Sequence, residues 1–395
     1  MKIGVAGPID LTLLRDLLAA DCDLPRAYSF PLIAHITRSL YRRGHEIVVF
    51  ALSMDVTQTR RIDGERITVY VCPQRRSPVQ MLDFLRVERH GLLAAMRDSG
   101  CSIIHAHWTY EFASAALKSG LPCVVTAHDV PSVVMRYARH PYWLEKPLLA
   151  FNVLRKAKCI TAVSPYAADA IRGWVKSAPQ VIVVPNGVTE DIFELHATRK
   201  PRRADAPFHF AAVLNDWYGR KNGTALLEAF AILRRQFGER VRLSMFGDEH
   251  QPEGAAHQWA RQHRLAEGVE FLGSLPYPVL MKRLAQTVDV LVHPALEESF
   301  CMVAAEAMAM GVPVIGGLHS GGITWVLDNG RAGLLVDVTS PKEIAQGMRT
   351  MIEDERLRDE LARAGRERAL KEFQLDNVAQ QYEDVLKQAL QEQSH

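Results

Sequence analysis

Short, continuous apolar runs recur along this 395-residue chain, and stretches of mixed polarity separate them. In the first part of the chain these runs occupy residues 2–7, 45–52, 66–72, 102–107, 123–128, 159–164 and 181–185. Runs without polar alternation are typical of strands buried on both faces, as in a parallel sheet covered by helices. Helical patterns fill several of the intervals, for example residues 30–43, 81–97 and 165–175. The sequence therefore predicts an α/β protein.

The alternation is interrupted at residues 196–207, HATRKPRRADAP, which are polar, basic and contain two prolines, as expected of a linker. A second series of apolar runs follows at residues 208–215, 241–247, 269–273, 289–294, 312–317 and 333–337. We therefore expect two doubly wound, Rossmann-like domains, residues 1–195 and 208–372, that bind ligands at the carboxyl ends of their strands. The charged segment 373–395 is expected to form a helix that packs back on the N-terminal domain.

The length and composition exclude several classes of protein. A chain of 395 residues exceeds the usual size of one hydrophobic core, and a net charge of +2 argues against a dedicated nucleic-acid binder. The six cysteines show no paired C-x-x-C spacing, which favours a reduced compartment. No apolar run approaches the ~20 residues of a membrane span, and the sequence MKIGVAGPID lacks the apolar segment of a signal peptide. We expect a soluble, cytoplasmic protein without a nucleic-acid partner.

Two carboxylates, Glu298 and Glu306, interrupt the otherwise core-like segment 297–317, EESFCMVAAEAMAMGVPVIGG. A helix is expected to begin near Ser299 and to end at Gly311, a residue type favoured at helix C-termini. Glu306 then lies roughly 12 Å further along the helix axis than Glu298. First-turn amides suit a phosphate or diphosphate, and a carboxylate on either side suits hydroxyl groups. A nucleoside diphosphate sugar has this layout of ribose, diphosphate and sugar.

A simpler interpretation accounts for each acid separately. The helix dipole favours acids in the first turn, which explains Glu297 or Glu298 without a ligand. Glu306 is then an exposed position on the helix surface. On composition alone the two interpretations are evenly matched.

An ordered series of motifs around this segment resembles the retaining glycosyltransferases of the GT-B fold, family four. Their hallmark is a glutamate, seven residues and a second glutamate, which begins the pattern E-A-m-a-x-G-x-P-V. The chain has this hallmark at residues 298–314. Further matching stretches are LYRRGHEIVVF, VVTAHD, ITAVSPYAADAI, VVPNGV, FGDE, FLGSLP and SGGITWVLDNGRAGLLV. The resemblance implies two doubly wound, Rossmann-like domains that face each other across a cleft. It also implies a hexosyltransferase that requires no metal ion or other cofactor.

The resemblance assigns roles to the glutamates and their neighbours. In the family the first glutamate, here Glu298, contacts hydroxyls of the donor sugar, and the second, here Glu306, holds the ribose. Phe300 and Cys301 fill the places whose backbone amides reach the diphosphate and sugar; Cys301 stands where the family usually has glycine, and no thiol chemistry is expected of it. The donor-binding residues implied are Arg220, Lys221, Glu298, Ser299, Phe300, Cys301, Met302 and Glu306.

The family also places basic residues after the first strand of its second domain. Lys221 matches the expected lysine, although Asn222 intervenes before the glycine. The position of the usual arginine falls near Leu214, so Arg220 is expected to take over its work. Without a metal ion, two basic groups are needed to stabilise a departing nucleoside diphosphate. The alternative is a solvated basic turn without a ligand.

His128 follows an expected strand and matches a family histidine near the reacting sugar, so the catalytic residues implied are His128, Lys221 and Glu298. His105 and His107 share one strand face, which makes a metal pair conceivable. No carboxylate or cysteine joins them at ligand spacing. Packing and hydrogen bonding is the favoured interpretation of this pair, and no metal site is predicted.

Two stretches depart from the family pattern. The first strand is normally followed by a Gly-Gly loop, but this chain has the long segment 8–31, in which Ser29 and Pro31 indicate a helix start. In the second domain, Ile323–Thr324–Trp325 replaces the usual Pro-Glu after Gly-Gly. The roles of both loops are left open.

The resemblance implies a reaction with retained anomeric configuration, usually described as a front-face displacement in which the leaving phosphate takes the acceptor's proton. Glu298 then orients the sugar, and Lys221 with Arg220 stabilises the diphosphate. A UDP-sugar is the favoured donor and GDP-mannose the alternative; the acceptor is a hydroxyl of a glycan, a glycolipid or a small molecule. The reaction belongs to polysaccharide or glycoconjugate biosynthesis.

The acceptor is expected to bind the N-terminal domain. Residues 139–158, RHPYWLEKPLLAFNVLRKAK, mix large apolar and basic side chains. Such a segment suits peripheral contact with the inner face of an anionic cell membrane that carries a lipid-linked acceptor. A core-facing helix with a basic outer face explains the same pattern equally well.

Other readings of the whole chain fit less well. A nicotinamide dehydrogenase needs G-x-G-x-x-G at the first βα turn, and only Gly4 and Gly7 are present. A two-domain α/β sugar-binding protein of the periplasmic type needs an export signal and leaves the glutamates beside Lys221 unexplained. Another GT-B enzyme, a sugar-nucleotide epimerase or a phosphorylase, stays open.

Overall fold

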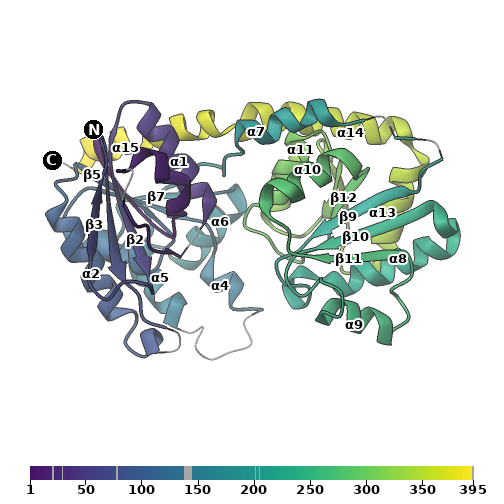
Figure 1. Ribbon diagram of the computed structural model, residues 1–395, viewed down its shortest axis with the longest axis horizontal. Helices are drawn as coiled ribbons and strands as arrows, with labels where there is room; N and C mark the ends of the chain where they lie inside the picture. Colours follow the sequence, from purple (N-terminus) through teal and green to yellow (C-terminus); the bar gives the residue numbers. More distant parts are fainter. Residues whose placement is uncertain are drawn as a thin grey trace. The chain divides into compact units, whose positions relative to one another are not determined.

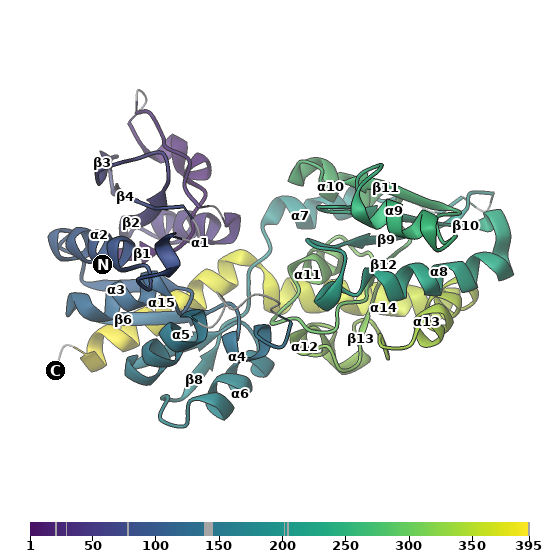
Figure 2. The ribbon, with the colours of Figure 1, turned by 90° about the horizontal axis from the view of Figure 1, so that it is seen from below.

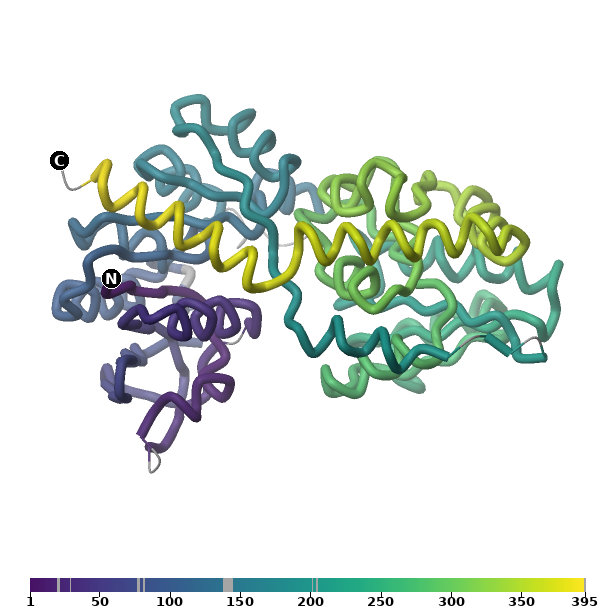
Figure 3. Tube along the Cα trace, turned by 90° about the horizontal axis from the view of Figure 1, so that it is seen from above, coloured from purple at the N-terminus to yellow at the C-terminus, as the bar shows by residue number. Residues whose placement is uncertain are grey.

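The structure is a computed structural model that describes residues 1–19, 22–28, 30–76, 79–137, 145–200, 202–203 and 205–393 (Figure 1). The chain divides into two compact units, one formed by Met1–Gly187 with Leu375–His395 and the other by Val188–Gln374. The tube in Figure 3 follows the chain from the first unit into the second and back through the C-terminal segment. Each unit has its own hydrophobic core. Within the described ranges, no helix combines the length and apolar character needed to cross a bilayer.

The first unit is built on an eight-stranded sheet of order β3-β4-β2-β1-β5-β6-β7-β8. Its strands are β1 Lys2–Ala6, β2 Glu46–Ser53, β3 Arg60–Asp63, β4 Ile67–Pro73, β5 Ile103–His107, β6 Cys123–Ala127, β7 Cys159–Ala162 and β8 Val181–Val183. All neighbours are parallel except β3, which pairs antiparallel with β4 at the sheet edge. Each expected strand of this unit is present. β3 was not predicted, because its sequence RRID buries only one side chain and shows no apolar run.

Helices cover both faces of this sheet (Figure 2). They are η1 Leu11–Leu17, α1 Pro31–Arg42, η2 Val79–Met81, α2 Arg86–Asp98, α3 Glu111–Ser119, α4 Pro131–Val134, α5 Glu145–Lys156, α6 Pro165–Trp174 and α15 Leu375–Gln393. α2 and α3 pack against strands on one face, and α1 and α15 pack together on the other. α6 shows why the chain forms helices here: Pro165 occupies the first turn, and the hydroxyl of Ser164 caps the amide of Ala167 at 3.2 Å.

The C-terminal helix α15 belongs to the first unit and packs on α1, β5 and β6. Ser39 Oγ donates to Asp376 Oδ1 at 2.7 Å. Glu383 pairs with Arg43 and, at 2.6 Å, with Lys387. These polar contacts fix the helix register on the unit that the chain left near Gly187.

Where the family has a Gly-Gly loop, this chain has the 3₁₀ helix η1. The Asp10 side chain caps η1 by accepting a hydrogen bond from the amide of Thr12. Asp16 at its end pairs with Arg38 of α1. α1 begins at Pro31, as expected, but Ser29 lies outside the described residues, so its predicted role as a cap is not tested.

The second unit is a six-stranded, fully parallel sheet of order β11-β10-β9-β12-β13-β14. Its strands are β9 Phe208–Val213, β10 Val241–Phe246, β11 Val269–Gly273, β12 Val290–His293, β13 Val314–Gly317 and β14 Leu334–Val336. Its helices are α7 Glu190–Glu194, η4 Leu195–Thr198, η5 Gly219–Lys221, α8 Gly223–Phe237, η6 Gly238–Arg240, α9 Ala255–Gln262, α10 Tyr277–Thr287, α11 Met302–Ala309, α12 Gly322–Val326, η7 Asp328–Gly330, α13 Pro341–Glu353, α14 Glu355–Arg368 and η8 Ala369–Phe373. The reversal of strand order between β9 and β12 places the ends of these central strands where a doubly wound sheet binds ligands.

The division into units differs from the expected boundaries, because the chain enters the second unit at Val188, ahead of the expected linker 196–207. Arg199 donates to the carbonyl oxygens of Ala285 and Val288 at 3.2 and 3.3 Å. These acceptors lie at the C-terminal end of α10, where carbonyl groups lack helical partners. Arg199 belongs to the stretch that was predicted to be a linker, and its side chain anchors that stretch to the second unit.

Candidate functional site

The segment between β12 and α11 carries Glu298 and is held in an extended conformation. The amide of Glu298 donates to the carbonyl of Ser320 at 3.1 Å, and its carbonyl accepts from the amide of Gly322 at 2.7 Å. Glu298 and Gly321 therefore form an isolated parallel β-bridge. The Gly-Gly pair that precedes Ile323–Thr324–Trp325 thus clamps the backbone of Glu298, which gives that loop a structural role.

The helix that follows begins later than expected. α11 starts at Met302, not near Ser299, and no side chain caps its first turn. Two features explain the correction: the β-bridge keeps Glu298 extended, and Cys301 has φ +86° and ψ +79°, which no helical turn accommodates. The amides of Ser299 and Phe300 are consequently not first-turn amides.

The Glu298 carboxylate lies in a cluster of donors, and its side chain is 12% exposed. Lys221 Nζ donates to Oε1 at 2.5 Å, and His293 Nε2 lies 2.9 Å from the same oxygen. Arg220 Nη1 faces Oε2 at 3.6 Å. Burial by itself raises the pKa of this carboxyl, but Lys221, His293 and Arg220 outweigh it and hold the pKa well below its usual range. Glu298 is therefore charged and fixed in orientation.

The basic turn η5 follows β9 and brings Arg220 and Lys221 to this carboxylate. Asn222, the residue that interrupts the family pattern, has φ +55° and closes the turn in the left-handed region. Its amide group donates to the carbonyl oxygens of Pro294 and Val338 at 3.1 and 2.8 Å. The turn is thereby tied to the end of β12, and the donor-binding role of Arg220 and Lys221 stays a prediction.

Arg220 has a second anchor, because its guanidinium donates to the carbonyl of Glu297 at 2.7 Å. Leu214, which stands near the position of the family's arginine, is fully buried in the core of this unit. The sequence departure therefore leaves Arg220 as the cation at this place.

Cys301 and Phe300 shape the loop. A φ of +86° is uncommon for a side chain with a Cβ and easy for glycine, which accounts for the glycine usual in the family. Burial raises the pKa of the Cys301 thiol, so the thiol stays uncharged. Phe300 packs edge-on against Phe373 at 5.3 Å, with Trp325 beside both rings. The loop is thus supported from behind by an aromatic cluster.

Glu306 lies on α11 and is 6% exposed, so its interpretation as an exposed helix position is wrong. The hydroxyl of Tyr277, at the start of α10, donates to Glu306 Oε1 at 2.8 Å. Burial raises the pKa of Glu306 to about 7, with a further rise from Asp191, and the Tyr277 hydrogen bond opposes this rise. A carboxyl group with one weak donor and no cation is poised to accept hydroxyl groups from a ligand.

His128 lies in the first unit, just after β6, in a cluster of aromatic side chains with the buried His107 and the partly buried Trp108. His128 Nε2 lies 2.9 Å from His107 Nδ1, and the two rings stack. Trp108 contacts the His128 ring at 4.7 Å between centroids. Burial lowers the pKa of His128 to about 4, with Asn186 hydrogen-bonded in opposition. His128 is a neutral imidazole at ordinary pH.

His105 and His107 behave as the packing interpretation expects. His105 Nε2 lies 2.7 Å from the hydroxyl of Thr126, and its ring packs 4.7 Å from that of Tyr382 on α15. Burial lowers the pKa of His105 to about 3. In the part of the chain that the structure describes, no group of three or more histidine, cysteine, aspartate or glutamate side chains is arranged to hold a metal ion.

Two residues of the second-unit cluster were not predicted, His293 and Tyr277. His293 carried a usable signal, because it ends the run VLVH at the carboxyl end of a central strand. Tyr277 carried none, because only the tertiary packing of α10 on α11 brings it to Glu306.

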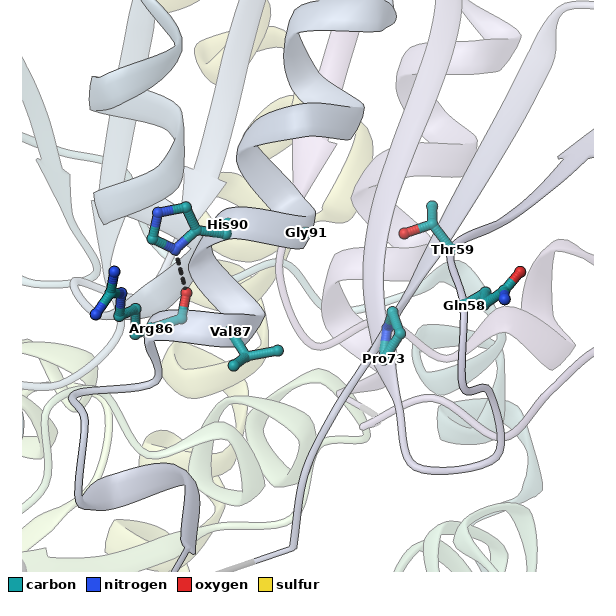
Figure 4. A pocket seen from close by; sticks show the side chains of 7 residues that line it. All are labelled: Gln58, Thr59, Pro73, Arg86, Val87, His90 and Gly91. Atoms are coloured by element: carbon teal, nitrogen blue, oxygen red, sulfur yellow. Dashed lines mark hydrogen bonds between the residues drawn. The ribbon is translucent and has the colours of Figure 1, made fainter.

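The first unit also contains a cavity of about 650 Å³ that the sequence did not predict. Figure 4 shows its lining residues, Gln58, Thr59, Pro73, Arg86, Val87, His90 and Gly91. It lies between the start of α2 and the chain that leaves β2 and β4. His90 Nδ1 bonds to the Arg86 carbonyl at 2.6 Å. The cavity combines apolar walls with a guanidinium and an imidazole.

Comparison with known proteins identifies the class of this molecule. Residues 199–368 match the Glycosyl transferases group 1, and residues 32–192 match Glycosyltransferase Family 4. The D-inositol 3-phosphate glycosyltransferase of Nocardioides sp. is 38% identical over 313 residues, which cover 73% of this chain and 67% of that protein. The glycogen synthase of Mycobacterium tuberculosis is 25% identical over 88% of this chain and 87% of its own.

Solved structures give the same architecture. Sucrose-phosphate synthase from Thermosynechococcus elongatus superposes with a TM-score of 0.75 at 18% identity, covering 98% of both chains. Anabaena HepE in complex with UDP-glucose gives 0.69 at 18% identity, covering 98% of this chain and 100% of that chain. Two units of this kind form the GT-B fold, and the predicted fold class is confirmed.

The chain belongs to glycosyltransferase family 4 of the group 1 glycosyl transferases. It is an enzyme, a glycosyltransferase, as the sequence predicted. The dehydrogenase and the non-catalytic binding protein are thereby excluded as readings of this chain.

Proposed function

We propose that this enzyme transfers a hexose from a UDP-sugar to an acceptor hydroxyl with retention of configuration, in polysaccharide or glycoconjugate biosynthesis. The observation that carries the proposal is the Glu298 cluster. A buried carboxylate at the carboxyl end of β12 is fixed by Lys221 and His293 and flanked by Arg220. Glu306 stands eight residues further on, also buried, with its own hydroxyl donor.

The donor follows from the chemistry of these groups. Glu298 Oε2 is directed at hydroxyl groups of the sugar, the cations Arg220 and Lys221 serve the diphosphate, and Glu306 serves the ribose. Backbone and side-chain groups of Ser299, Phe300, Cys301 and Met302 line the diphosphate in this proposal. Structural neighbours have been solved with UDP, UDP-glucose and UDP-2-fluoro glucose, which supports UDP over GDP as the donor base. GDP-mannose is the alternative donor.

In the proposed reaction the bond between the anomeric carbon and the diphosphate oxygen breaks while the acceptor oxygen bonds to the same face of that carbon. The acceptor's proton passes to the leaving phosphate oxygen. Glu298 orients the sugar and does not attack it, and Lys221 with Arg220 stabilises the charge that builds on the diphosphate. No metal ion takes part in this proposal.

His128 is proposed to lie against the reacting sugar. Its Nε2 pairs with His107 Nδ1 at 2.9 Å. A hydrogen bond from Nε2 to a sugar hydroxyl would therefore replace that contact, and His107→Ala should alter the donor's KM as well as His128→Ala.

The acceptor is proposed to bind the first unit. Arg86, a cation that suits an anionic group, is among the residues that border the pocket in Figure 4, so phosphorylated polyols belong in the acceptor panel, beside glycans and glycolipids. This choice agrees with the name of the inositol phosphate glycosyltransferase relative.

Peripheral contact with the inner face of the cell membrane is a second part of the acceptor proposal, for an enzyme placed in the cytoplasm. Within residues 139–158, those numbered 139–144 lie outside the described residues, and the remainder forms α5 and the residues after it. Its inner face packs in the core through Val153 and Leu154, while Leu148 and Phe151 are 62% and 40% exposed beside the exposed Arg155. Co-sedimentation with anionic and neutral liposomes tests this contact; equal pelleting with both would sink it.

The experiment that tests the reaction offers a panel of UDP- and GDP-sugars to the purified enzyme, with and without a chelator. We expect turnover of one UDP-hexose, insensitivity to the chelator and a product with the anomeric configuration of the donor. Inversion, epimerisation of the donor or phosphorolysis would each contradict the proposal.

A further inference from the structure

His293 ends β12 and is almost completely buried. Its Nε2 lies 2.9 Å from Glu298 Oε1, and its Nδ1 makes no hydrogen bond with the residues that the structure describes. A carboxylate only accepts hydrogen bonds, so the contact requires a proton on Nε2. Burial lowers the pKa of His293, which the Glu298 contact opposes. His293 is therefore a neutral donor locked in the Nε2–H tautomer.

The two donors to Glu298 converge on one oxygen. Lys221 Nζ and His293 Nε2 both bond to Oε1, while Oε2 faces Arg220 at 3.6 Å. This arrangement fixes the carboxylate plane and keeps both donors off Oε2. Asn222 reinforces it, because its side chain bonds to the carbonyl of Pro294, the residue after His293.

Lys221 has two tasks in the proposed reaction. Without a donor it pairs with Glu298, and with a donor it is to stabilise the diphosphate. When its ammonium turns toward phosphate oxygens, Glu298 loses its closest cation. His293 is a neutral imidazole at the end of a strand, so the phosphate does not attract it as it attracts an ammonium group. Its hydrogen bond to Glu298 therefore persists.

We infer that His293 is a positioning residue. It holds the Glu298 carboxylate in the orientation that binds the donor sugar while Lys221 contacts the diphosphate. The inference rests on the proposed function for the identity of the ligand. It adds a residue that the glutamate motif does not contain, and it explains why a histidine ends a strand whose other residues are all apolar.

The test compares His293→Leu, which removes the donor, with His293→Gln, whose side-chain amide offers an N–H at similar reach. We expect His293→Leu to lower kcat/KM for the nucleotide sugar by about 10- to 100-fold. His293→Gln should recover most of that loss. Binding of the free nucleoside diphosphate should change by less than about twofold in both, because that ligand has no sugar for Glu298 to grip.

Two controls separate positioning from damage to the fold. His209→Leu removes another buried histidine of the same sheet, which bonds to Ser244 at 2.7 Å, and it should spare kcat/KM relative to His293→Leu. Adding His293→Leu to Glu298→Ala should cause no further loss, since the histidine acts only through the carboxylate. A further loss in the double variant, or equal losses in His209→Leu and His293→Leu, would overturn the inference.

A spectroscopic readout is independent of turnover. In protein labelled with ¹⁵N-histidine, the signal of a neutral Nε2–H imidazole should vanish in His293→Gln and shift in Glu298→Ala. If the spectrum behaves so while no nucleotide sugar is turned over, the geometry stands and the proposed reaction fails. An Nδ1–H tautomer for His293, or a signal unmoved by Glu298→Ala, would refute the positioning role itself.

Discussion

Glu298 and Glu306 are eight residues apart, the first largely and the second fully buried, yet their surroundings are opposite. Glu298 lies among Lys221, Arg220 and His293, and its pKa is held well below the usual range. Glu306 has one hydroxyl partner, Tyr277, and burial raises its pKa to about 7. A shared motif thus contains one carboxylate with a permanent charge and one whose charge depends on pH and on ligand.

The difference follows from which elements each side chain meets. Glu298 sits where the basic turn η5 meets the end of β12, so cations offset its desolvation. Glu306 projects from α11 toward α10, where burial and the charge of Asp191 both disfavour its ionisation. We read the first as a preformed grip on the sugar and the second as a hydroxyl acceptor that a ligand must help to ionise.

The largest effect is expected when the cationic cluster is broken. Glu298→Gln or Lys221→Ala should lower kcat/KM by about 10²- to 10³-fold, because each removes an oriented charge at the reacting end of the donor. Each variant also removes the closest charge-assisted hydrogen bond of this cluster, so a loss of about 1.5–3 kcal/mol in unfolding free energy should accompany it.

Steady-state assays on folded protein, checked by circular dichroism, measure this effect. Full activity in both purified variants would show that Glu298 and Lys221 do not belong to the catalytic site. A matched control is Arg234→Ala, whose partner Glu267 is exposed and whose loss should leave kcat/KM unchanged.

The ligand-free protein should also show the burial of Glu306 in its stability. The folded pKa of about 7 lies above the ordinary 4.5, so the folded state keeps a proton that the unfolded chain loses. Stability is therefore highest below about pH 4.5 for this group and falls as the pH rises toward 7. Glu306→Gln should stabilise the ligand-free protein by about 2–3 kcal/mol at pH 8 and by much less at pH 5.

Urea denaturation of wild type and Glu306→Gln at the two pH values measures the effect as a difference, which cancels other titrating groups. A stability difference that does not change with pH would contradict the raised pKa.

The ionisation of Glu306 should also change the affinity of the enzyme for its donor. Glu306 accepts two ribose hydroxyl bonds only when deprotonated, so affinity for an intact nucleotide sugar should rise about tenfold from pH 6 to pH 8. Glu306→Gln should bind more weakly at pH 8 and show a flat profile. Calorimetry with an intact UDP-sugar is the appropriate measurement, and a wild-type profile as flat as that of the variant would refute this role.

Tyr277→Phe should produce a smaller shift of that profile. The Tyr277 hydroxyl lowers the pKa of Glu306, so its removal should move the midpoint of the affinity profile to higher pH while affinity at pH 9 stays within about threefold of wild type. An unmoved midpoint would show that the hydroxyl does not act on Glu306 in solution.

The sequence predicted the sheets well, because continuous apolar runs such as VLVH and VIGG have few other ways to be buried. It missed β3, an edge strand with a single buried residue, and the start of α11, which depends on a backbone bridge to Gly321. Both failures involve backbone pairing, of β3 with the next strand β4 and of Glu298 with Gly321, which leaves no apolar pattern in the paired residues.

The candidate site was predictable in its residue types and not in its electrostatics. The Glu298–Lys221 contact joins residues 77 positions apart, and the family resemblance assigned a role to each of them separately. The opposite pKa shifts of the two glutamates depend on which helix or turn packs against each, and Tyr277 shows no pattern that points to Glu306. Burial and partners are properties of the packed unit, so the sequence left Glu306 evenly divided between a binding role and an exposed surface.

The smallest effect is expected at Cys301, where the extended segment of Glu298 turns into the helix of Glu306. Its φ of +86° costs a residue with a Cβ about 1–2 kcal/mol, which glycine avoids at the expense of chain entropy and a buried thiol. The unfolding free energy of Cys301→Gly should therefore lie within about 1 kcal/mol of the wild-type value, and its kcat/KM within about threefold. Cys301→Val, with a branched Cβ at the same φ, should lose at least about 2 kcal/mol. If Cys301→Gly abolished turnover while Cys301→Val kept it, the thiol and not the backbone turn would link the two glutamates, because only a side-chain role predicts that order.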